Sequence, residues 1–331
     1  HQALQANTTA SSNVAIGNHA LLSNTTGGNN TALGNGALQL NTTNHANTAI
    51  GTTALNANTA DNNTAVGTNA LLVNTTGTPN TAIGSYSLQA NTTGESNTAL
   101  GSSALQENTT GSNNTGIGRL ALFANTTGTQ NVAVGNFTLD ANTTANNNTA
   151  VGHKSLGANT TASSNTAVGA FSLDACTTGN NNVAVGASAA TSVTTALNTI
   201  AIGQSALSSV TTGNKNVAVG NQAGNTITTG ANNMCLGENA QPSSATVSNE
   251  ITLGNSNNGT LRCQTQTISS LSDKRDKTNI IDIEDGLDLI NLLKPRKFTW
   301  AMREPSANDG KTELGFIAQE LDEVLGNKND Y

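Results

Sequence analysis

The sequence predicts an all-β protein, a parallel β-solenoid of about 15 turns with a 17-residue period, followed by a short segment of mixed α and β structure. Three observations lead to this prediction. A glycine recurs at nearly constant spacing through the first 254 of 331 residues, aromatic residues make up only 2% of the chain, and charged residues make up 10%. Ordinary soluble domains carry about 25% charged residues, so a thin repetitive body is expected here.

The repeat reads N-T-A-(I/V/L)-G-x-x-A-L-x-x-N-T-T-G-x-x, and every glycine follows the last by 17 residues except Gly67, which follows Gly51 by 16. A unit of this length is too short for two helices. It suits one solenoid coil, with two short strands joined by Gly- and Asn-rich corners. Stacked coils place equivalent residues about 4.8 Å apart, so each position of the repeat becomes a column along the rod.

Two columns are predicted to face the interior of the coil. The residue before each glycine is aliphatic in every turn, from Ile16 to Leu253, and the residue four after it is leucine in the first ten turns, from Leu21 to Leu173. The residue two before the glycine is nearly always alanine. Alternation along a strand puts this third column on the opposite face, where its small size predicts close approach by a neighbouring chain.

The asparagine that opens N-T-T is also predicted to be buried. It persists from Asn24 to Asn159 and is then replaced in register by other residues, from Cys176 to Ile227, most of them aliphatic. Such replacement indicates an interior position, so we expect a hydrogen-bonded asparagine ladder at a corner of the coil. Glycosylation is the alternative interpretation of N-T-T, but a buried asparagine cannot carry a glycan.

The column two after the glycine is mostly polar and is predicted to be exposed. Tyr86, Phe137 and Phe171 lie in it. Exposed aromatic rings on a regular face can stack on sugar rings, which makes these three residues candidate ligand contacts. Scattered surface aromatics are the alternative interpretation.

Charge and spacing argue against several classes of function. Residues 1–254 hold ten charged residues, of which three are basic, so neither nucleic acid nor an acidic membrane surface is an expected partner. No stretch approaches the ~20 apolar residues of a membrane span. Cys176, Cys235 and Cys263 lack the spacing of a metal site, and no cofactor is expected.

The pattern changes after Gly254. Residues 255–271 are predicted to be a polar connector, with a loosely alternating stretch at 259–267, and residues 272–331 are ordinary mixed sequence. In this last segment we predict strands at 279–283, 297–302 and 314–318, and helices at 285–293 and 319–325.

Three motifs follow one another there: Ser272-Asp273-x-Arg275-x-Lys277-x-Asn279-Ile280, Leu293-x-Pro295-x-x-Phe298-x-Trp300, and Gly315-Phe316-Ile317-Ala318-Gln319-Glu320. In order and spacing they resemble the intramolecular chaperone domain of endosialidase-type phage tailspikes and fibres. The resemblance implies that 272–331 is the N-terminal portion of an α+β domain that trimerises, templates the preceding shaft and then releases itself.

The same resemblance implies a catalytic pair. Ser272 is the nucleophile that attacks the carbonyl of Leu271, and Lys277 is the general base, so the chain is cut between Leu271 and Ser272. A purely structural role, in which Ser272 and Lys277 cap a turn or the start of a helix, is the alternative.

The repeats themselves are similar to the head repeats of trimeric autotransporter adhesins, which are left-handed parallel β-rolls packed three-fold. They also resemble repeats upstream of chaperone domains in phage and phage-like fibre proteins. These resemblances imply a left-handed coil and a homotrimer.

The sequence therefore predicts a structural and adhesive fibre of a virion or cell surface that attaches to a host glycan or protein receptor, with self-cleavage as its one reaction. A bacterial trimeric surface adhesin is the alternative. A depolymerase is disfavoured because the acidic residues of the shaft, Asp140 and Asp174 among them, are isolated in variable columns. Ice binding is disfavoured because the threonines follow asparagine and do not form a flat T-x-T face.

Overall fold

A computed structural model describes residues 2–258, 260, 292–299, 312–317 and 320. The chain divides into two compact units, His1–Asn255 and Ser256–Tyr331. The first unit is the repeat region, called the shaft below, and the second is the C-terminal unit.

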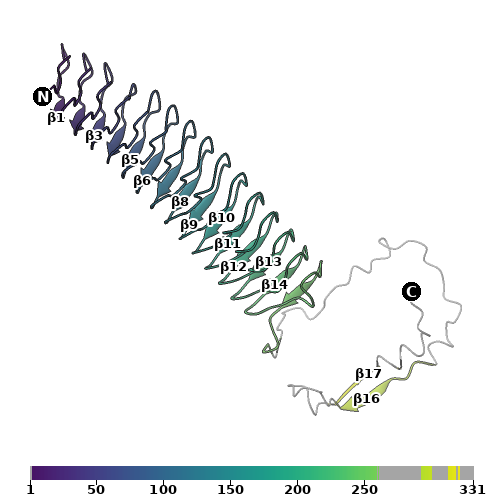
Figure 1. Cartoon of the computed structure of the whole chain (residues 1–331). Coiled ribbons are helices and arrows are strands. Elements are labelled where there is room, and N and C mark those ends of the chain that lie inside the picture. The colour runs from purple at the N-terminus through teal and green to yellow at the C-terminus, as the bar shows by residue number, and fades with distance from the viewer. Residues whose placement is uncertain (1, 259, 261–291, 300–311, 318–319, 321–331) are drawn as a thin grey trace, which may run out of the picture. The chain divides into compact units, whose positions relative to one another are not determined.

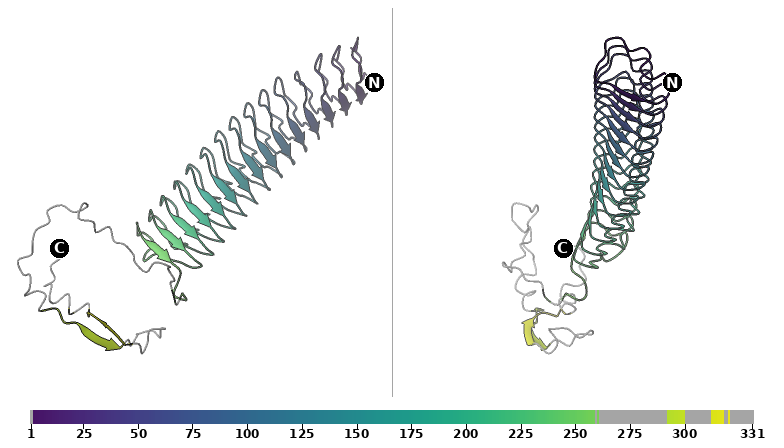
Figure 2. Two further views of the ribbon diagram at one scale, coloured as in Figure 1. Left: turned by 180° about the vertical axis from the view of Figure 1, so that it is seen from behind. Right: turned by 90° about the vertical axis from the view of Figure 1, so that its left-hand side faces the viewer.

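The shaft is a parallel β-solenoid, as the repeat predicts. Each turn contributes one three-residue strand, and each strand pairs with the next in sequence to give a 15-stranded sheet along the rod (Figures 1 and 2). The strands are β1 Val14–Ile16, β2 Thr31–Leu33, β3 Thr48–Ile50, β4 Thr64–Val66, β5 Thr81–Ile83, β6 Thr98–Leu100, β7 Thr115–Ile117, β8 Val132–Val134, β9 Thr149–Val151, β10 Thr166–Val168, β11 Val183–Val185, β12 Ile200–Ile202, β13 Val217–Val219, β14 Met234–Leu236 and β15 Ile251–Leu253.

The prediction of two strands per coil is wrong, because the side opposite the strand has a different backbone. In turn six, Gly101, Ser103 and Leu105 all have positive φ, at 140°, 57° and 53°. Left-handed residues at alternate positions curl the chain tightly and cannot extend into a strand. Such a conformation costs a non-glycine residue of order 1–2 kcal/mol, and the packing of each turn on the next holds it in place.

The predicted facing of the two strand columns is also wrong. The alanine column points into the coil and is fully buried, as at Ala82 and Ala99. The aliphatic column before the glycine points outward, and Leu33 and Leu100 are 43% and 45% exposed. The alanines are small because the interior of a single coil is narrow, and no neighbouring chain is needed to explain their size.

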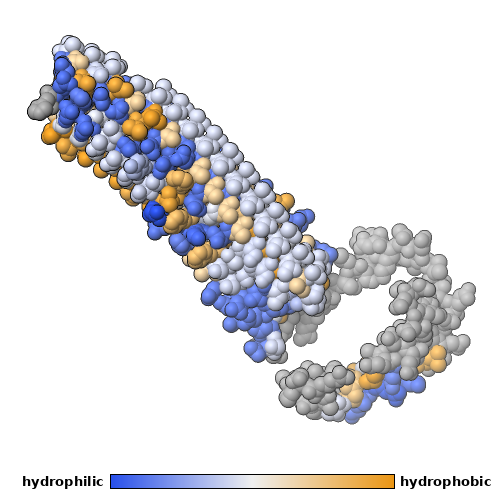
Figure 3. Space-filling view, in the orientation of Figure 1, coloured by the Kyte–Doolittle hydropathy of each residue, from blue (hydrophilic) through white to orange (hydrophobic). Residues whose placement is uncertain are grey.

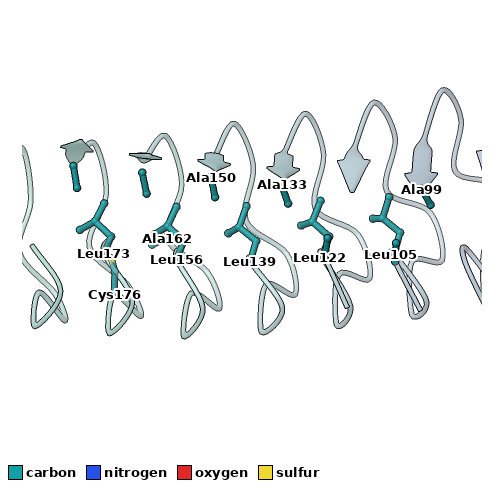
Figure 4. Packing of buried hydrophobic residues seen from close by; sticks show 14 of the residues in the cluster. Ala99, Leu105, Leu122, Ala133, Leu139, Ala150, Leu156, Ala162, Leu173 and Cys176 are labelled. Carbon is teal, nitrogen blue, oxygen red and sulfur yellow. The ribbon is translucent and has the colours of Figure 1, made fainter. Parts of the chain in front are cut away.

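The leucine column is buried, as predicted, and it fills the interior from the side opposite the strand (Figure 4). The fit against the alanine column is close. Gly116 occupies an alanine position, and a Cβ added there would lie 3.4 Å from Cδ1 of Leu105. The carbonyl oxygen of Ala121 would be nearer still, at 3.2 Å, so beside a leucine there is room for an alanine and little more. The larger Cys235 occupies the alanine column where Gly224 replaces the leucine.

The 16-residue turn leaves the sheet intact. Strand β3 pairs with β4 in the same register as elsewhere, with Thr48 opposite Thr64. The missing residue is taken from the N-T-T corner, where Asn58-Thr59 is followed directly by Ala60. The deletion is therefore confined to the corner.

In the C-terminal unit, β16 Arg296–Thr299 and β17 Thr312–Gly315 form an antiparallel pair. The strands predicted at 297–302 and 314–318 are thereby confirmed, with bounds that start one or two residues earlier. The strand predicted at 279–283, the alternating stretch 259–267 and the helices predicted at 285–293 and 319–325 lie wholly or largely outside the described residues. Among the described residues, no helix is long and apolar enough to cross a membrane.

Candidate functional site

The outward aliphatic column forms a continuous hydrophobic stripe along the shaft, called the aliphatic stripe below. Ten of its fifteen side chains are at least 36% exposed and the other five are half-buried. Figure 3 shows hydrophobic surface along the edge of the rod where Figure 1 draws the strands. The stripe consists of Ile16, Leu33, Ile50, Val66, Ile83, Leu100, Ile117, Val134, Val151, Val168, Val185, Ile202, Val219, Leu236 and Leu253.

The asparagines of N-T-T form the predicted internal ladder. In the middle of the shaft, Nδ2 of Asn108 donates to Oδ1 of Asn91 at 2.8 Å and to the carbonyl of Gly111 at 2.9 Å, and the side chain is fully buried. Every bond between two asparagines of this ladder is donated from one turn to the preceding turn. Each Nδ2 group thus donates to a carbonyl of its own corner and to the asparagine Oδ1 of the turn before.

A second asparagine ladder, which was not predicted, runs along the residues that precede the strands. The backbone N–H of Asn114 donates to Oδ1 of Asn97 at 3.0 Å, and Nδ2 of Asn97 donates to the carbonyl of Gly111 at 2.8 Å. The signal is visible in the sequence, since asparagine occupies this position in thirteen of fifteen turns. Burial of the N-T-T asparagines was predicted because aliphatic residues replace them in later turns. The asparagines of this second column are not replaced in that way, so the sequence carries no equivalent sign of burial.

Two irregularities interrupt the first ladder, and each leaves a buried oxygen without a partner among the described residues. Oδ1 of Asn41 has none because Asn58, in the short turn, donates to Ala60 instead, at 2.6 Å. Oδ1 of Asn159 has none because Cys176 takes the next position. Sγ of Cys176 donates to the carbonyl of Gly179 at 3.3 Å. The thiol thus keeps the hydrogen bond to the corner carbonyl but not the bond to the asparagine of the preceding turn.

Both described cysteines, Cys176 and Cys235, are buried free thiols. Burial raises the pKa of Cys176 to about 11, because the thiolate is disfavoured away from water. Burial also raises the pKa of Cys235, and the nearby Glu250 carboxylate adds to the effect. Cys263 lies outside the described residues.

Of the candidate ligand contacts, Phe137 and Phe171 lie two turns apart with His153 between them. The centroid of the His153 ring is 6.0 Å from that of Phe137 and 5.3 Å from that of Phe171, and its plane is roughly perpendicular to both. Phe171 is 39% exposed and Phe137 is half-buried. The third candidate, Tyr86, is equally exposed but lies three turns before Phe137, so the structure does not bring it to the same place.

Charged side chains surround these rings. The guanidinium carbon of Arg119 lies 5.1 Å from the ring centroid of Phe137, which is a cation–π contact. In the same turns, Asp140 and Asp174 converge over Gly157. A Cβ added to this glycine would lie 2.6 Å from Oδ1 of Asp174 and 3.6 Å from Oδ1 of Asp140. The interpretation of these two carboxylates as isolated is therefore wrong.

Partial burial raises the pKa of Asp140 and of Asp174 above the ordinary value for aspartate. Lys154, from the turn between them, opposes the effect on both, and His153 opposes it on Asp174. Burial is the larger influence in each case. These carboxylates thus accept a proton more readily than an exposed aspartate does.

The catalytic pair Ser272 and Lys277, with the cleavage site at Leu271, lies outside the described residues. Nearby in sequence, the structure does connect two of the motifs of the C-terminal unit. Nε and Nη2 of Arg296 each donate to a carboxylate oxygen of Glu320 at 2.8 Å, a bidentate ion pair. The ion pair thus connects Glu320, the last residue of the third motif, to strand β16.

Known proteins resemble parts of this chain. Residues 272–328 match the family described as chaperone of endosialidase. The uncharacterized protein VP1 of Micromonas pusilla reovirus (isolate Netherlands/2005) is 48% identical over 60 residues, which are 18% of this chain and 3% of the viral protein. The chain thus corresponds to a small fraction of that relative. No solved structure matches the chain.

The fold and the family match together indicate a class of protein, a β-solenoid rod followed by a segment that matches a chaperone family. More particularly, the endosialidase-type chaperone match at the C-terminus, the similarity to a viral protein and the solenoid shaft fit a phage-type tail fibre with a C-terminal chaperone domain. The resemblance predicted from the three motifs is confirmed.

Proposed function

We propose that this chain is the shaft of a homotrimeric virion fibre that attaches to a host or other surface, and that its C-terminal segment templates trimer assembly. The observation that carries the proposal is the aliphatic stripe, which runs the length of a rod whose C-terminal segment matches a chaperone family. Similarity to a viral protein supports a virion rather than a bacterial surface.

The regularity of the stripe favours copies of the same chain as its partners. A surface that repeats in every turn is matched best by a partner with the same spacing, and another copy has it by construction. Full burial of a Val, Leu or Ile side chain stabilises by about 1.5–3 kcal/mol. The stripe side chains are already partly buried, so each would contribute less than this, but the contributions of fifteen side chains add along the rod.

A regular stripe also explains the need for a template. Two such rods slipped by one turn lose only one turn of contact, so the correct alignment is weakly specified. A trimeric domain at one end aligns three chains before the shaft forms, which disfavours misaligned assemblies.

The proposed release reaction uses Ser272 and Lys277. Lys277 takes the hydroxyl proton as Oγ of Ser272 attacks the carbonyl carbon of Leu271. The peptide bond breaks, an ester to Oγ forms, and the proton passes to the freed amine of Ser272. Water then hydrolyses the ester and leaves a carboxylate on Leu271. The lysine must be partly desolvated to act as a base near neutral pH, and burial on trimerisation would supply this condition.

Native mass spectrometry of the expressed chain tests assembly and release together. We expect a trimer of chains that end at Leu271, and an intact chain when Ser272→Ala is introduced. A shaft that remains monomeric would refute the fibre proposal. Cleavage of Ser272→Ala at the same bond would refute the assigned nucleophile but not the fibre. Attachment is tested by binding of the labelled, mature shaft to intact host cells.

A further inference from the structure

The shaft departs most from its consensus between residues 119 and 174. Three of the four aromatic residues of the shaft lie in this stretch, and so do four of its ten charged residues. A periodic rod presents the same surface at every turn, so it cannot bind a ligand at one place unless some turns differ. This stretch is where they differ.

Three successive turns of this stretch build one continuous surface. After β8 the chain presents Phe137 and Asp140, and after β10 it presents Phe171 and Asp174 in the same two columns. The turn between them has His153 between the rings, Lys154 close enough to Asp140 and Asp174 to lower the pKa of both, and Gly157 beneath the two carboxylates. We call this surface the Phe137–Phe171 patch.

Buried hydroxyls anchor the patch from inside the coil. Thr138, Ser155 and Ser172 directly follow Phe137, Lys154 and Phe171. Elsewhere from Ala20 to Ala240 this position is alanine, apart from Ser87 after Tyr86. Oγ1 of Thr138 donates to the carbonyl of Gly152 at 2.6 Å, Oγ of Ser172 donates to that of Gly169 at 2.9 Å, and Oγ of Ser155 bonds to Oγ of Ser172 at 2.9 Å. A surface fixed in this way loses little entropy on binding.

We propose that the Phe137–Phe171 patch binds a neutral saccharide. The exposed ring of Phe171 stacks against the apolar face of a sugar ring and the half-buried Phe137 extends this apolar surface, while Asp140 and Asp174 accept hydrogen bonds from sugar hydroxyls and Lys154 donates one. The proposal rests on the attachment role proposed above and assigns that role a site and a class of ligand.

The charges in and beside the patch decide between ligand classes. Lys154 and, from the preceding turn, Arg119 against Phe137 balance Asp140 and Asp174, so no net charge of either sign would select a polyanion or a polycation. Charged hydrogen-bonding groups beside aromatic rings suit a ligand that offers hydroxyls and C–H surface together. A neutral saccharide has both.

Affinity electrophoresis of the full chain tests the proposal. The gels contain dextran, mannan, a galactan or a rhamnan, and alginate serves as the anionic comparison. We expect at least one neutral polysaccharide to retard the chain and alginate to retard it less. Phe171→Ala and Asp174→Asn should each weaken the interaction about tenfold, which corresponds to ~1.4 kcal/mol. Gly157→Gln should weaken it as well, because the added side chain occupies the space where the two carboxylates converge.

Gln222→Ala is the matched control, since Gln222 lies exposed in the same column as Phe171 with a similar φ, 54° against 58°. It should bind like the unaltered chain. Retardation by none of the neutral polysaccharides, or equal retardation of all variants, would overturn the proposal. Loss of the trimer in Phe171→Ala would also overturn it, because the patch would then be a contact between chains. Native mass spectrometry of the same samples separates this failure from failure of the fibre proposal, in which the unaltered chain is not a trimer.

Discussion

Nδ2 of Asn108 donates a 2.8 Å hydrogen bond to Oδ1 of Asn91, the equivalent residue one turn earlier. The bond lies in the interior of the coil, where neither atom has access to water. A buried polar group left without its partner costs about 1–3 kcal/mol, so the ladder is a strong constraint on sequence.

Asn108→Val should therefore destabilise the shaft by about 1–3 kcal/mol, because it removes the donor to Asn91 and the acceptor for Asn125. Asn159→Val is the matched control. It also removes a donor, the one to Asn142, but the Oδ1 atom that it removes has no hydrogen-bond partner among the described residues. Its loss of stability should therefore be smaller than that of Asn108→Val. Urea unfolding followed by circular dichroism measures both, and equal losses would contradict the ladder as the cause.

The glycine that ends each strand should tolerate no side chain. Gly101 has φ of 140°, and a Cβ there would lie 2.5 Å from the carbonyl oxygen of Gly118 in the next turn. Gly101→Ala must force two turns apart, and we expect a clear fall in melting temperature with loss of soluble protein.

Gly36→Asn is the control for that experiment. Gly36 has φ of 66°, in a column where asparagine at position 69 has a similar φ of 58°. An added Cβ would meet only the ends of side chains, at 3.2 Å or more. Stability should be unchanged or slightly higher, because asparagine tolerates this conformation and restricts the unfolded chain more than glycine does. An equal loss for both variants would contradict the steric argument.

Ile83→Asp with Leu100→Asp should dissociate the proposed trimer and leave the coil folded. Both side chains point outward, at 39% and 45% exposure, so a carboxylate remains hydrated in the single chain but is buried in an assembly. Analytical ultracentrifugation gives the mass and circular dichroism the fold. Thr93→Asp, at an exposed corner, is the control and should remain a trimer. A trimer that survives both stripe substitutions would place the interface elsewhere.

Cys176 should react very slowly with an aromatic disulfide reagent at pH 8 in the folded protein. With a pKa of about 11, only about one thiol in a thousand is ionised at that pH, and the thiolate is the reactive form. The measurement uses Cys263→Ser, so that only the two buried thiols report, and unfolding in guanidinium should release both. Rapid labelling before unfolding would show that the coil opens locally at this turn.

Asp174→Asn should raise the melting temperature near pH 7 and have less effect in acid. Burial raises the pKa of Asp174 in the folded state, so folding disfavours its ionised form above that pKa. The penalty disappears as the pH falls, because the carboxylate is then protonated in both states. Lys154, His153 and Asp140 are the charged or titratable groups nearby, and the first two oppose the effect. A variant less stable at pH 7 would indicate that the Lys154 contact outweighs burial.

The period of the repeat was enough to predict the solenoid, its register and two of its interior columns. The facing of the strand was not predictable by alternation alone, because both of its alternating columns are apolar. What decides it is the leucine column opposite, which leaves room beside each leucine for little more than an alanine, as the 3.4 Å distance from an added Cβ at Gly116 to Leu105 indicates.

The Phe137–Phe171 patch was predictable in part. Asp140, Gly157 and Asp174 are spaced by 17 residues, so the period alone makes them neighbours. The direction of the side chains could not be predicted from the sequence. The two carboxylates converge because Gly157, which lies between them, leaves room.

The short turn between β3 and β4 has a consequence for alignment. Because its deletion lies in the corner, the strand register and the aliphatic stripe continue through it unchanged. The stripe repeats at every turn, and the one change in repeat length lies in a corner away from it. In the proposed trimer the stripe alone therefore does not fix the relative position of neighbouring chains, which is the role proposed for the C-terminal segment.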